Sequence, residues 1–483
     1  MSSVWEKCYP LVPPWAQSFG LSLYGLAWRR ERLGGDFPQY VREFRERDAW
    51  SPEEFQGYLN AELRKVLSKA FSCVPYYGNA WQNTGVRSRE LLQLTVSDLE
   101  QLPITRKDDL RKDPDRFVCQ PTENARRLHR YYSSGTTGTP IVAICTADGH
   151  RKFIAAREAR SFNWAGTSLL RPRSMIGGRM VVAKGISKPP YHRYNWAEKQ
   201  VYFSAYHISP ANARHYVEAL NRYQPKVCTG YAYSHYLLAR MMLDQGLTLD
   251  YRPEALVLSS EKLTPEMKKV IRHAFGTRPY EEYGCVENCV LATECEHGRL
   301  HVSPDFGILE IVDEHGHAVP PGVEGRILCT SLLNEAQLLV RYENGDLGAW
   351  SEEVCPCGRR HLPVLKEVVG RLEDVVTGPD GRQMVRFHGI FIDLRGVLEG
   401  QVIQEQADLF KVRVVAGTGF GVREEQLIRQ RFEDRLGQVR VILEKVPEIP
   451  RTERGKFRAV ISNVKTPNSG LERVVPGLAD RRP

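Results

Sequence analysis

The chain has 483 residues, of which 42% are hydrophobic and 26% are charged. That length can bury a large core and predicts two or more domains. The formal net charge of +9 is modest, and the basic residues are scattered among acids, so the composition does not indicate nucleic-acid binding and fits an anionic substrate equally well.

Neither a membrane span nor an export signal is expected from the sequence. The chain contains no run of the roughly 18 to 20 apolar residues that cross a bilayer. Its first residues, Met1 to Lys7, lack the basic region and apolar stretch of a signal peptide. We therefore expect a cytoplasmic protein.

The cysteine content favours a reducing compartment. Eleven cysteines are spread through the chain, and an odd number in so long a sequence argues against a disulfide framework. We expect mostly reduced thiols, some of them available to hold metal.

Residues 1–50 form an N-terminal extension that is rich in aromatic side chains. Pro10, Pro13 and Pro14 interrupt the aromatic segment between Trp5 and Trp28, which rules out one continuous helix. We expect the segment to pack against the rest of the protein, with contact to a membrane surface as the alternative.

From residue 52 onward, helical and strand-like patterns alternate. Amphipathic helices are predicted over residues 52–70, 211–223 and 233–245. Apolar runs typical of strands lie between and beyond them, at residues 200–203, 255–259, 307–312 and 325–330. This alternation predicts an α/β architecture, and we find no internal repeat.

The densest group of candidate ligand-binding residues lies between Tyr131 and Pro140. Its glycines allow the backbone to approach a ligand closely, so that N–H groups and hydroxyls can converge on phosphate oxygens. The run differs from a Walker A loop in its spacing, and no lysine follows the last glycine. Its composition alone is more typical of a flexible surface turn, so other motifs must decide. The candidates are Ser133, Ser134, Gly135, Thr136, Thr137, Gly138 and Thr139.

Four downstream motifs supply acids, an arginine and a lysine in a definite order. The run Tyr283-Gly284-Cys285-Val286-Glu287 places a carboxylate just after a turn, and Asp346 lies in a glycine-flanked turn. The run Gly370-Arg371-Leu372-Glu373-Asp374 follows, and Lys456 comes after a glycine near the end of the folded chain. Each motif alone fits a solvated charge or an ordinary turn. Turns and surface charges do not explain why they occur together in this order.

Together, the loop and these motifs resemble the adenylate-forming superfamily, and within it the phenylacetate-CoA ligase-like branch, especially members linked to capsular polysaccharide gene clusters. The resemblance covers roughly residues 55–463. It implies that the loop at residues 133–139 wraps the phosphates of ATP and that Glu287 helps to hold magnesium. It also implies that Asp346 and Arg371 bind the ribose. Tyr283 and Gly284 would line the adenylate, and the turn ending at Glu261 would lie against adenine.

The resemblance implies ATP-dependent activation of a small-molecule carboxylic acid. A carboxylate is a poor nucleophile toward a polyanion, so attack on the α-phosphorus requires neutralised phosphate charge and aligned reactants. Magnesium and Lys456 would provide both, and Thr137 is counted with Lys456 and Glu287 as catalytic. In the family a small C-terminal domain rotates between the two half-reactions. We therefore expect an adenylation domain over residues 51–370, a mobile α+β lysine-bearing domain over 371–463 and a disordered tail over 464–483.

The expected acceptor of the acyl group is CoA, which would make the protein an acyl- or aryl-CoA ligase. Two features depart from the pattern of phenylacetate-CoA ligases. Thr139 stands where many relatives have lysine, and residues 375–400 lack the motif that helps to form the thioester-stage face. The alternative is an amide or ester synthetase whose acceptor is an amine, a hydroxyl or a carrier-protein thiol. A third hypothesis is a zinc-stabilised nucleotide-binding scaffold without turnover.

A separate group of thiols and imidazoles has the composition of a zinc site. Cys355 and Cys357 flank a single proline, and Cys295 lies upstream with His297 and His301 close behind it. Three thiolates and one imidazole form a closed tetrahedral site of structural type, although the same residues also fit reduced thiols on a loop. The spacing in zinc-bearing members of the branch selects Cys295, His301, Cys355 and Cys357, with His297 as the competing ligand.

Overall fold

The computed structural model describes most of the chain, namely residues 9, 12–83, 87–120, 128–133, 141–183, 186, 188–371, 376–379, 383–384, 388–391, 394, 396–450 and 457–464. Contacts divide the chain into two compact units. The larger unit takes in the chain up to Val312, Ala318–Leu372 and Pro450–Arg458. The smaller unit takes in Asp313–His317, Glu373–Ile449 and the chain from Ala459 onward.

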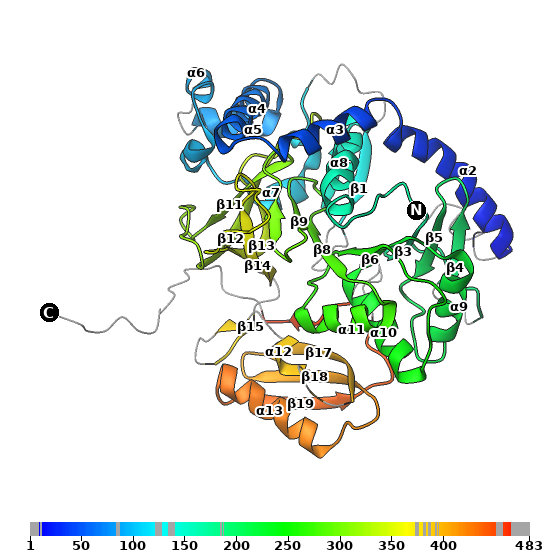
Figure 1. The fold of residues 1–483 in the computed structure, drawn as a ribbon. Coiled ribbons are helices and arrows are strands. Elements are labelled where there is room, and N and C mark those ends of the chain that lie inside the picture. Colours follow the sequence, from blue (N-terminus) through cyan, green and yellow to red (C-terminus); the bar gives the residue numbers. More distant parts are fainter. Residues whose placement is uncertain are drawn as a thin grey trace. The chain divides into compact units, whose positions relative to one another are not determined.

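The larger unit is built on one twelve-stranded mixed sheet (Figure 1). Its strand order is β11-β12-β13-β14-β10-β9-β8-β7-β6-β3-β5-β4. The stretch from β8 to β5 is parallel, and the strands on either side of it pair antiparallel. The bounds are β3 Arg173–Gly177, β4 His192–Asn195, β5 Gln200–Ser204, β6 Val227–Tyr231, β7 Ala255–Ser259, β8 Pro279–Gly284, β9 Leu291–Glu294, β10 Leu300–Val302, β11 Gly307–Val312, β12 Glu324–Ser331, β13 Tyr342–Trp350 and β14 Val364–Arg371.

A separate antiparallel pair consists of β1 (His129–Tyr132) and β2 (Val142–Cys145), which flank the glycine-rich run in the sequence. Helices surround the sheet and connect its parallel strands. They are α2 Pro14–Leu33, α3 Phe37–Arg47, α4 Pro52–Cys73, α5 Pro75–Asn83, α6 Ser88–Leu91, α7 Lys107–Lys112, α8 Ala147–Arg157, α9 Ala213–Tyr223, α10 Ala232–Gln245 and α11 Pro265–Phe275, with short η segments at Val96–Gln101, Pro114–Phe117 and Glu158–Phe162.

The predicted α/β fold is confirmed, and most predicted elements lie where the sequence patterns put them. Strands β7 and β11 have the predicted bounds, residues 255–259 and 307–312. The predicted helix from residue 52 is α4, which runs three residues further than expected, to Cys73. Ser51 starts it with a capping box, in which its hydroxyl accepts from the Glu54 N–H and the Glu54 carboxylate accepts from the Ser51 N–H.

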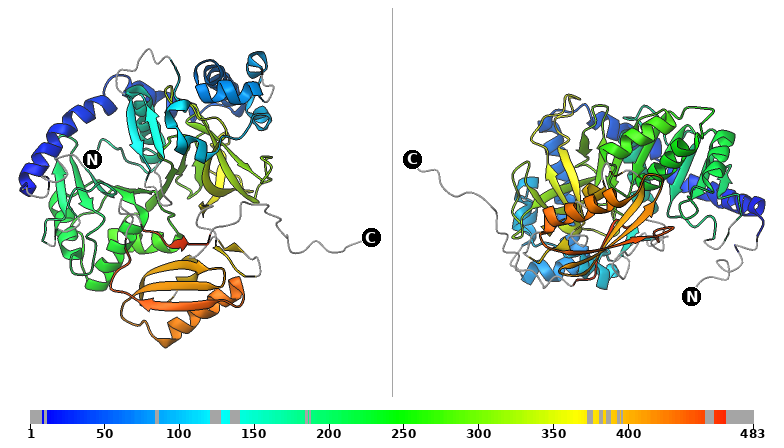
Figure 2. Two further views of the ribbon diagram at one scale, coloured as in Figure 1. Left: turned by 180° about the vertical axis from the view of Figure 1, so that it is seen from behind. Right: turned by 90° about the horizontal axis from the view of Figure 1, so that it is seen from below.

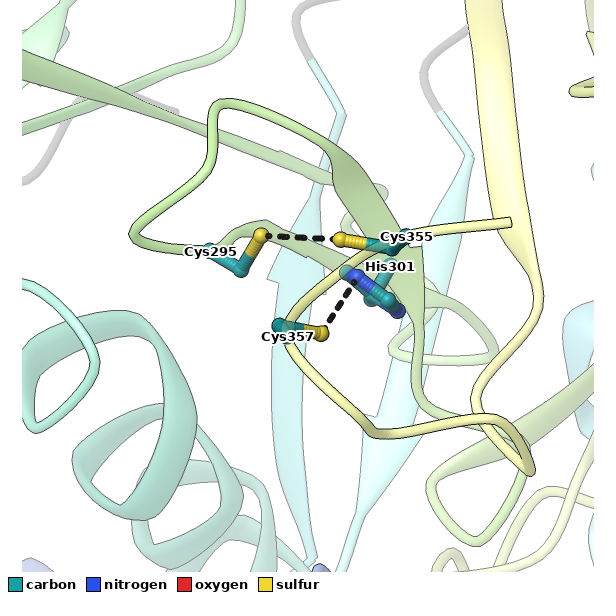
Figure 3. A group of neighbouring side chains, drawn as sticks. All are labelled: Cys295, His301, Cys355 and Cys357. Carbon is teal, nitrogen blue, oxygen red and sulfur yellow. Dashed lines mark hydrogen bonds between the residues drawn. The ribbon is translucent and has the colours of Figure 1, made fainter. Parts of the chain in front are cut away.

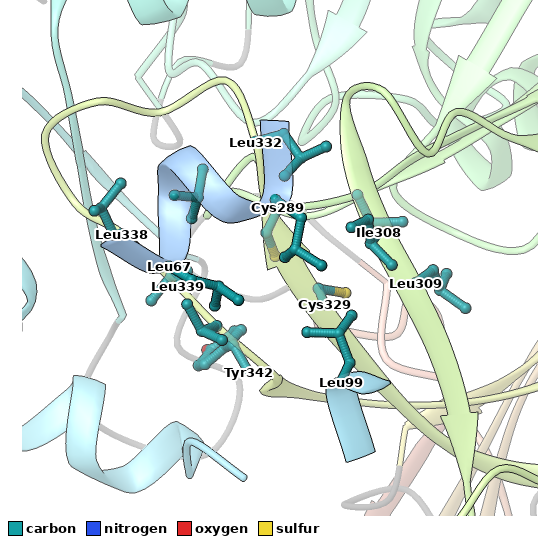
Figure 4. Close-up of a cluster of buried hydrophobic side chains, with 14 of the residues drawn as sticks. Leu67, Leu99, Cys289, Ile308, Leu309, Cys329, Leu332, Leu338, Leu339 and Tyr342 are labelled. Atoms are coloured by element: carbon teal, nitrogen blue, oxygen red, sulfur yellow. The ribbon is translucent and has the colours of Figure 1, made fainter. Parts of the chain in front are cut away.

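The largest core cluster lies where α4 and the antiparallel end of the sheet meet (Figure 4). Leu67 from α4 packs here with Cys329 of β12, Cys289 and Tyr342, and all four side chains are fully buried. Cys289 and Tyr342 belong to chain segments that also carry candidate site residues. The core therefore fixes the backbone of those segments from one side.

The smaller unit is α+β, as expected. Its four-stranded sheet has the order β19-β18-β17-β20, with β17 Val397–Gln406, β18 Leu409–Ala416, β19 Arg440–Lys445 and β20 Val460–Ser462 (Figure 1). Helix α13 (Val422–Leu436) covers the sheet with buried Ile428, Phe432 and Leu436. Short elements precede the sheet, namely β15 Val376–Thr377, β16 Gln383–Met384 and α12 His388–Phe391.

One disulfide, between Cys73 and Cys119, joins the end of α4 to the segment after Phe117. No pattern in the sequence indicates this pair. Among the described residues the remaining cysteines are free thiols, in line with the expected predominance of reduced cysteine: Cys145, Cys228, Cys285, Cys289, Cys295, Cys329, Cys355 and Cys357. None of the described helices combines the length and hydropathy needed to cross a membrane.

Candidate functional site

The glycine-rich run closes at its base through Ser133, which is its one described candidate. The Ser133 N–H donates to the carbonyl of Ile141 at 2.9 Å, and the Ile141 N–H donates to the Ser133 hydroxyl at 2.8 Å. These two bonds fix the point at which the chain leaves β1 and enters β2. The other candidates of the run lie outside the described residues: Ser134, Gly135, Thr136, Thr137, Gly138 and Thr139.

Tyr283 and Asp346, which are 63 positions apart in sequence, meet through a direct hydrogen bond. The Tyr283 hydroxyl donates to Asp346 Oδ2 at 2.8 Å, and Asn344 Nδ2 donates to the Tyr283 hydroxyl at the same distance. The Asn344 side chain also accepts from the Asp346 N–H at 2.9 Å. Burial, and then the charge of Asp346, raises the pKa of Tyr283 well above its ordinary value, so the phenol stays a donor.

Arg371 lies directly across from Asp346 in the pairing of β13 with β14. Gly345 precedes Asp346 within β13, where the pairing with β12 is irregular, and its φ of +85° is a conformation that side chains rarely adopt. A Cβ added at Gly345 would also lie 2.8 Å from Lys107 Nζ, which donates to the Asn344 carbonyl at 2.9 Å. Lys107 thus holds this part of β13, and no local pattern in the sequence indicates the contact.

Glu287 lies in the turn between β8 and β9, and its side chain is buried. Its Oε1 accepts from the Tyr342 hydroxyl at 2.8 Å. Burial, followed by the charge of Glu287, raises the pKa of Tyr342 well above its ordinary value, which keeps this donor protonated. Gly284 precedes the turn, and a Cβ there would lie 3.2 Å from the Val290 carbonyl.

Glu261 follows β7 and accepts two backbone hydrogen bonds. Its Oε2 accepts from the Tyr233 N–H at 2.9 Å, and its Oε1 accepts from the Phe457 N–H at 3.2 Å. The Tyr233 N–H is in the first turn of α10, and Tyr231, at the N-cap, makes no side-chain cap, so Glu261 caps this helix from outside.

Phe457 belongs to the larger unit, like Glu261 and Tyr233. Its ring stacks on that of Tyr233, with centroids 4.2 Å apart and planes 7° from parallel. A stack and a backbone hydrogen bond therefore dock this segment beside β7 and α10. Lys456, the neighbour of Phe457, lies outside the described residues.

The four candidate zinc ligands come together although they belong to two separate segments (Figure 3). Cys295 and His301 lie on the β9–β10 hairpin, and Cys355 and Cys357 lie on the connection from β13 to β14. One ligand atom from each residue lies within 4.8 Å of every other. Two sulfurs, Cys295 Sγ and Cys355 Sγ, are 3.6 Å apart, and Cys357 Sγ is 3.4 Å from His301 Nε2.

The His301 ring is oriented for ligation. Its Nδ1 lies 2.8 Å from the carbonyl of Leu362, a geometry in which Nδ1 carries the proton and Nε2 presents a lone pair to the sulfurs. The Trp164 ring meets the His301 ring edge-on at 5.9 Å. His297, the competing ligand, is exposed and does not join the cluster.

Comparisons with known proteins find relatives over most of the chain. The family described as the CapK C-terminal domain matches residues 377–463. Protein CapK of Staphylococcus aureus is 27% identical over 462 residues, which cover 93% of this chain and 97% of that protein. The phenylacetate-coenzyme A ligase of Thermus thermophilus is 28% identical over 336 residues, which cover 67% of this chain and 72% of that protein.

A solved structure shares the fold. It is 2-hydroxyisobutyryl-CoA ligase in the postadenylation state, which aligns with a TM-score of 0.67 and 22% identity over 85% of this chain and 90% of that chain. Sequence relatives and fold both agree with the resemblance carried by the motifs. The chain is thus similar over nearly its whole length to Protein CapK and over about two thirds of its length to phenylacetate-coenzyme A ligases, and its residues 377–463 match the CapK C-terminal domain, which supports the resemblance to the adenylate-forming superfamily.

Proposed function

We propose that the protein is an ATP-dependent, AMP-forming ligase that activates a small-molecule carboxylic acid as an acyl-adenylate and passes the acyl group to the thiol of CoA. The observation that carries this proposal is the meeting of three distant motifs at one end of the large sheet. Tyr283 bonds to Asp346, Asp346 pairs in register with Arg371, and Glu287 bonds to Tyr342 in the same strand as Asp346. Two of the similar proteins, from Thermus thermophilus and from the solved structure, are named as CoA ligases, and this supports CoA as the proposed acceptor.

The nucleotide would lie along this group of residues. Asp346 offers a carboxylate for the ribose hydroxyls, with its position fixed by Tyr283 and Asn344. Arg371, its cross-strand partner, supports the same sugar, and Gly284 allows the adenylate to approach the backbone. The loop at residues 133–139 would hold the phosphates, with Thr137 among the groups that contact them.

Glu287 is proposed as a magnesium ligand. Its buried carboxylate is held by Tyr342, and a carboxylate oxygen is the donor that this hard cation prefers. When bound, the cation neutralises phosphate charge during attack on the α-phosphorus. Lys456 would supply the second positive charge, so that the acid's carboxylate oxygen bonds to the α-phosphorus while pyrophosphate leaves.

For Glu261 we propose a positioning role in addition to the contact of its turn with adenine that the resemblance implies. Both of its carboxylate oxygens accept backbone N–H groups, one from α10 and one from Phe457. We propose that it positions the segment that follows Lys456, and that contact with adenine falls to the backbone of its turn. It would be a positioning residue rather than a catalytic one.

Zinc is proposed in the cluster of Cys295, His301, Cys355 and Cys357. The donor set is three thiols and one imidazole, the His301 tautomer suits ligation, and four protein ligands leave no open position. The metal would therefore be structural. It would tie the β9–β10 hairpin to the connection between β13 and β14, which are the strands that carry Asp346 and Arg371.

The proposed reaction can be tested by measuring pyrophosphate release over a panel of carboxylic acids, and by then adding CoA or an amine to each active acid. We expect release with at least one acid, and consumption of the adenylate on addition of CoA. Asp346→Ala should abolish release, whereas Asp408→Ala, which removes an exposed acid of the smaller unit, should not. Transfer to an amine but not to CoA would identify an amide synthetase. If no acid gives pyrophosphate, the ligase proposal is wrong.

A further inference from the structure

Helix α2 turns polar and small residues toward the protein and several large apolar residues toward solvent, which is the reverse of an ordinary surface helix. Its buried residues are Gln17, Ser22 and Gly25, which are polar or small. Five of its large apolar side chains point outward and are 47% to 75% exposed, namely Trp15, Phe19, Leu23, Tyr24 and Leu26, whereas Leu21, Trp28 and Leu33 are partly buried. A surface helix ordinarily buries its apolar stripe and exposes its polar one.

The sheet explains the inward polar face. Strand β4 is the edge of the large sheet, and α2 lies beside it (Figure 1, Figure 2). The Ser18 hydroxyl accepts from the Tyr194 N–H at 3.3 Å, and the Ser22 hydroxyl accepts from the Trp196 N–H at 3.1 Å. These serines satisfy amides that an edge strand otherwise leaves unpaired. Gly25 permits the close approach, because a Cβ there would lie 2.5 Å from Asn195 Nδ2.

No contact among the described residues covers the outward apolar face of α2. The exposed apolar surface also extends beyond the helix to neighbouring segments. Trp196 follows β4 beside Ser22, and Leu170 lines one hollow with Arg29 and Leu33 of α2. Met180 precedes Val181, which packs with Leu21 of α2. These three side chains are also about half exposed. Eight of the fifteen exposed large apolar side chains in the described part of the chain thus lie on or beside α2, which is a patch rather than scatter.

The patch has a basic rim. Residues 14–28 contain no charged side chain, and exposed Arg29 and Arg30 follow at the end of this stretch. Residues 171–199, which flank α2, hold seven basic side chains and one acid, Glu198, a net charge of +6 within a chain of net +9. Four of the seven are exposed: Arg171, Arg179, Lys188 and Lys199. The basic residues are therefore more concentrated in this part of the chain than the overall composition suggests.

We propose that the outer face of α2 docks on the surface of a phospholipid bilayer that contains anionic lipids. The helix would lie in the plane of the interface, with its Trp, Phe, Tyr and Leu side chains among the acyl chains and the basic rim on the headgroup phosphates. Charge disfavours a second copy of the chain as the occupant. A two-fold contact through this face would set one basic rim against another.

Vesicle flotation of the full chain tests this proposal. We expect the protein to float with vesicles of phosphatidylcholine and phosphatidylglycerol, and to float less with phosphatidylcholine alone or in high salt. The triple variant Trp15→Ser, Phe19→Ser, Leu23→Ser should lower the partition coefficient by about a hundredfold or more, since three large apolar side chains are lost from the bilayer. Arg30→Glu should lower it by about tenfold.

The matched control is Leu92→Ser, Val323→Ser, Ile442→Ser, which removes exposed apolar side chains elsewhere. It should bind like the unsubstituted protein. Because the α2 substitutions are on outward side chains, the triple variant should keep its thermal unfolding midpoint and its pyrophosphate release, so that lost binding is not lost folding. The proposal is overturned if the unsubstituted protein does not float, if both triple variants lose binding equally, or if the α2 variant only dissociates a dimer.

Discussion

Loss of the metal from the cysteine–histidine cluster should weaken the larger unit by a predictable amount. Cys295 and Cys355 are 60 positions apart, so a metal bound to both closes a loop of that length in the unfolded chain. The chain-entropy relation for a cross-link gives about 4 kcal/mol for such a loop at 25 °C. Removing the metal should therefore lower the free energy of unfolding by about that amount, as measured by denaturant titration with and without a chelator.

Two variants make the experiment specific. Cys357→Ser removes a ligand that Figure 3 shows beside His301, and it should lower both the zinc content and the free energy of unfolding. His297→Ala removes the exposed imidazole of the same hairpin and should change neither. Elemental analysis should find close to one zinc ion in each unsubstituted chain. The reasoning is refuted if purified protein is folded without metal, if the chelator removes zinc with no change in stability, or if His297→Ala loses the metal.

Three further substitutions probe the adenylate site and the buried charges. Tyr283→Phe removes a hydrogen bond to Asp346 and should raise the KM for ATP by roughly tenfold in pyrophosphate exchange; an unchanged KM would contradict the ribose assignment. Glu261→Ala should lower kcat of adenylation rather than raise the KM for ATP, because the N–H of Phe457, next to Lys456, loses its acceptor. A raised KM for ATP with an unchanged kcat would instead indicate that the Glu261 side chain contacts adenine. Burial alone would raise the pKa of Asp305, but the adjacent guanidinium groups of Arg160 and Arg47 hold this pKa below the ordinary value of 3.8. The stability that Asp305 contributes is therefore present above pH 3.8 and is lost as the pH falls through the lower pKa of the folded state. Asp305→Asn should remove this acid dependence and cost about 3 to 5 kcal/mol at neutral pH in denaturant titration, whereas Asp408→Asn, at an exposed ion pair, should leave the free energy of unfolding almost unchanged.

Local patterns were enough to predict two well-buried strands, one in the parallel stretch of the sheet and one at its edge. Residues 255–259 and 307–312 are short apolar runs bounded by turns, and they form β7 and β11, in which nearly every side chain is buried. The four candidate zinc ligands were named before the structure showed them together, but the resemblance to zinc-bearing relatives was needed to select them, because residue types and spacing alone also fitted reduced thiols on a loop.

Contacts between distant positions were not predictable. The amine of Lys107 reaches the carbonyl of Asn344 across 237 positions, and Cys73 meets Cys119 across 46. Both depend on how helices pack on the sheet, which no local pattern encodes. The N-terminal segment was expected to pack on the rest of the protein, and it does, but composition could not show that its serines face inward and its aromatic residues outward.

The contact of α2 with β4 also limits where the chain can be shortened. A protein that began after Leu33 would keep every strand of the sheet yet would lose the hydroxyls that accept from the amides of Tyr194 and Trp196. The bare margin of β4 would then be a template on which strands of other molecules can pair. The N-terminal extension thus protects the β4 edge of the sheet from pairing with strands of other molecules.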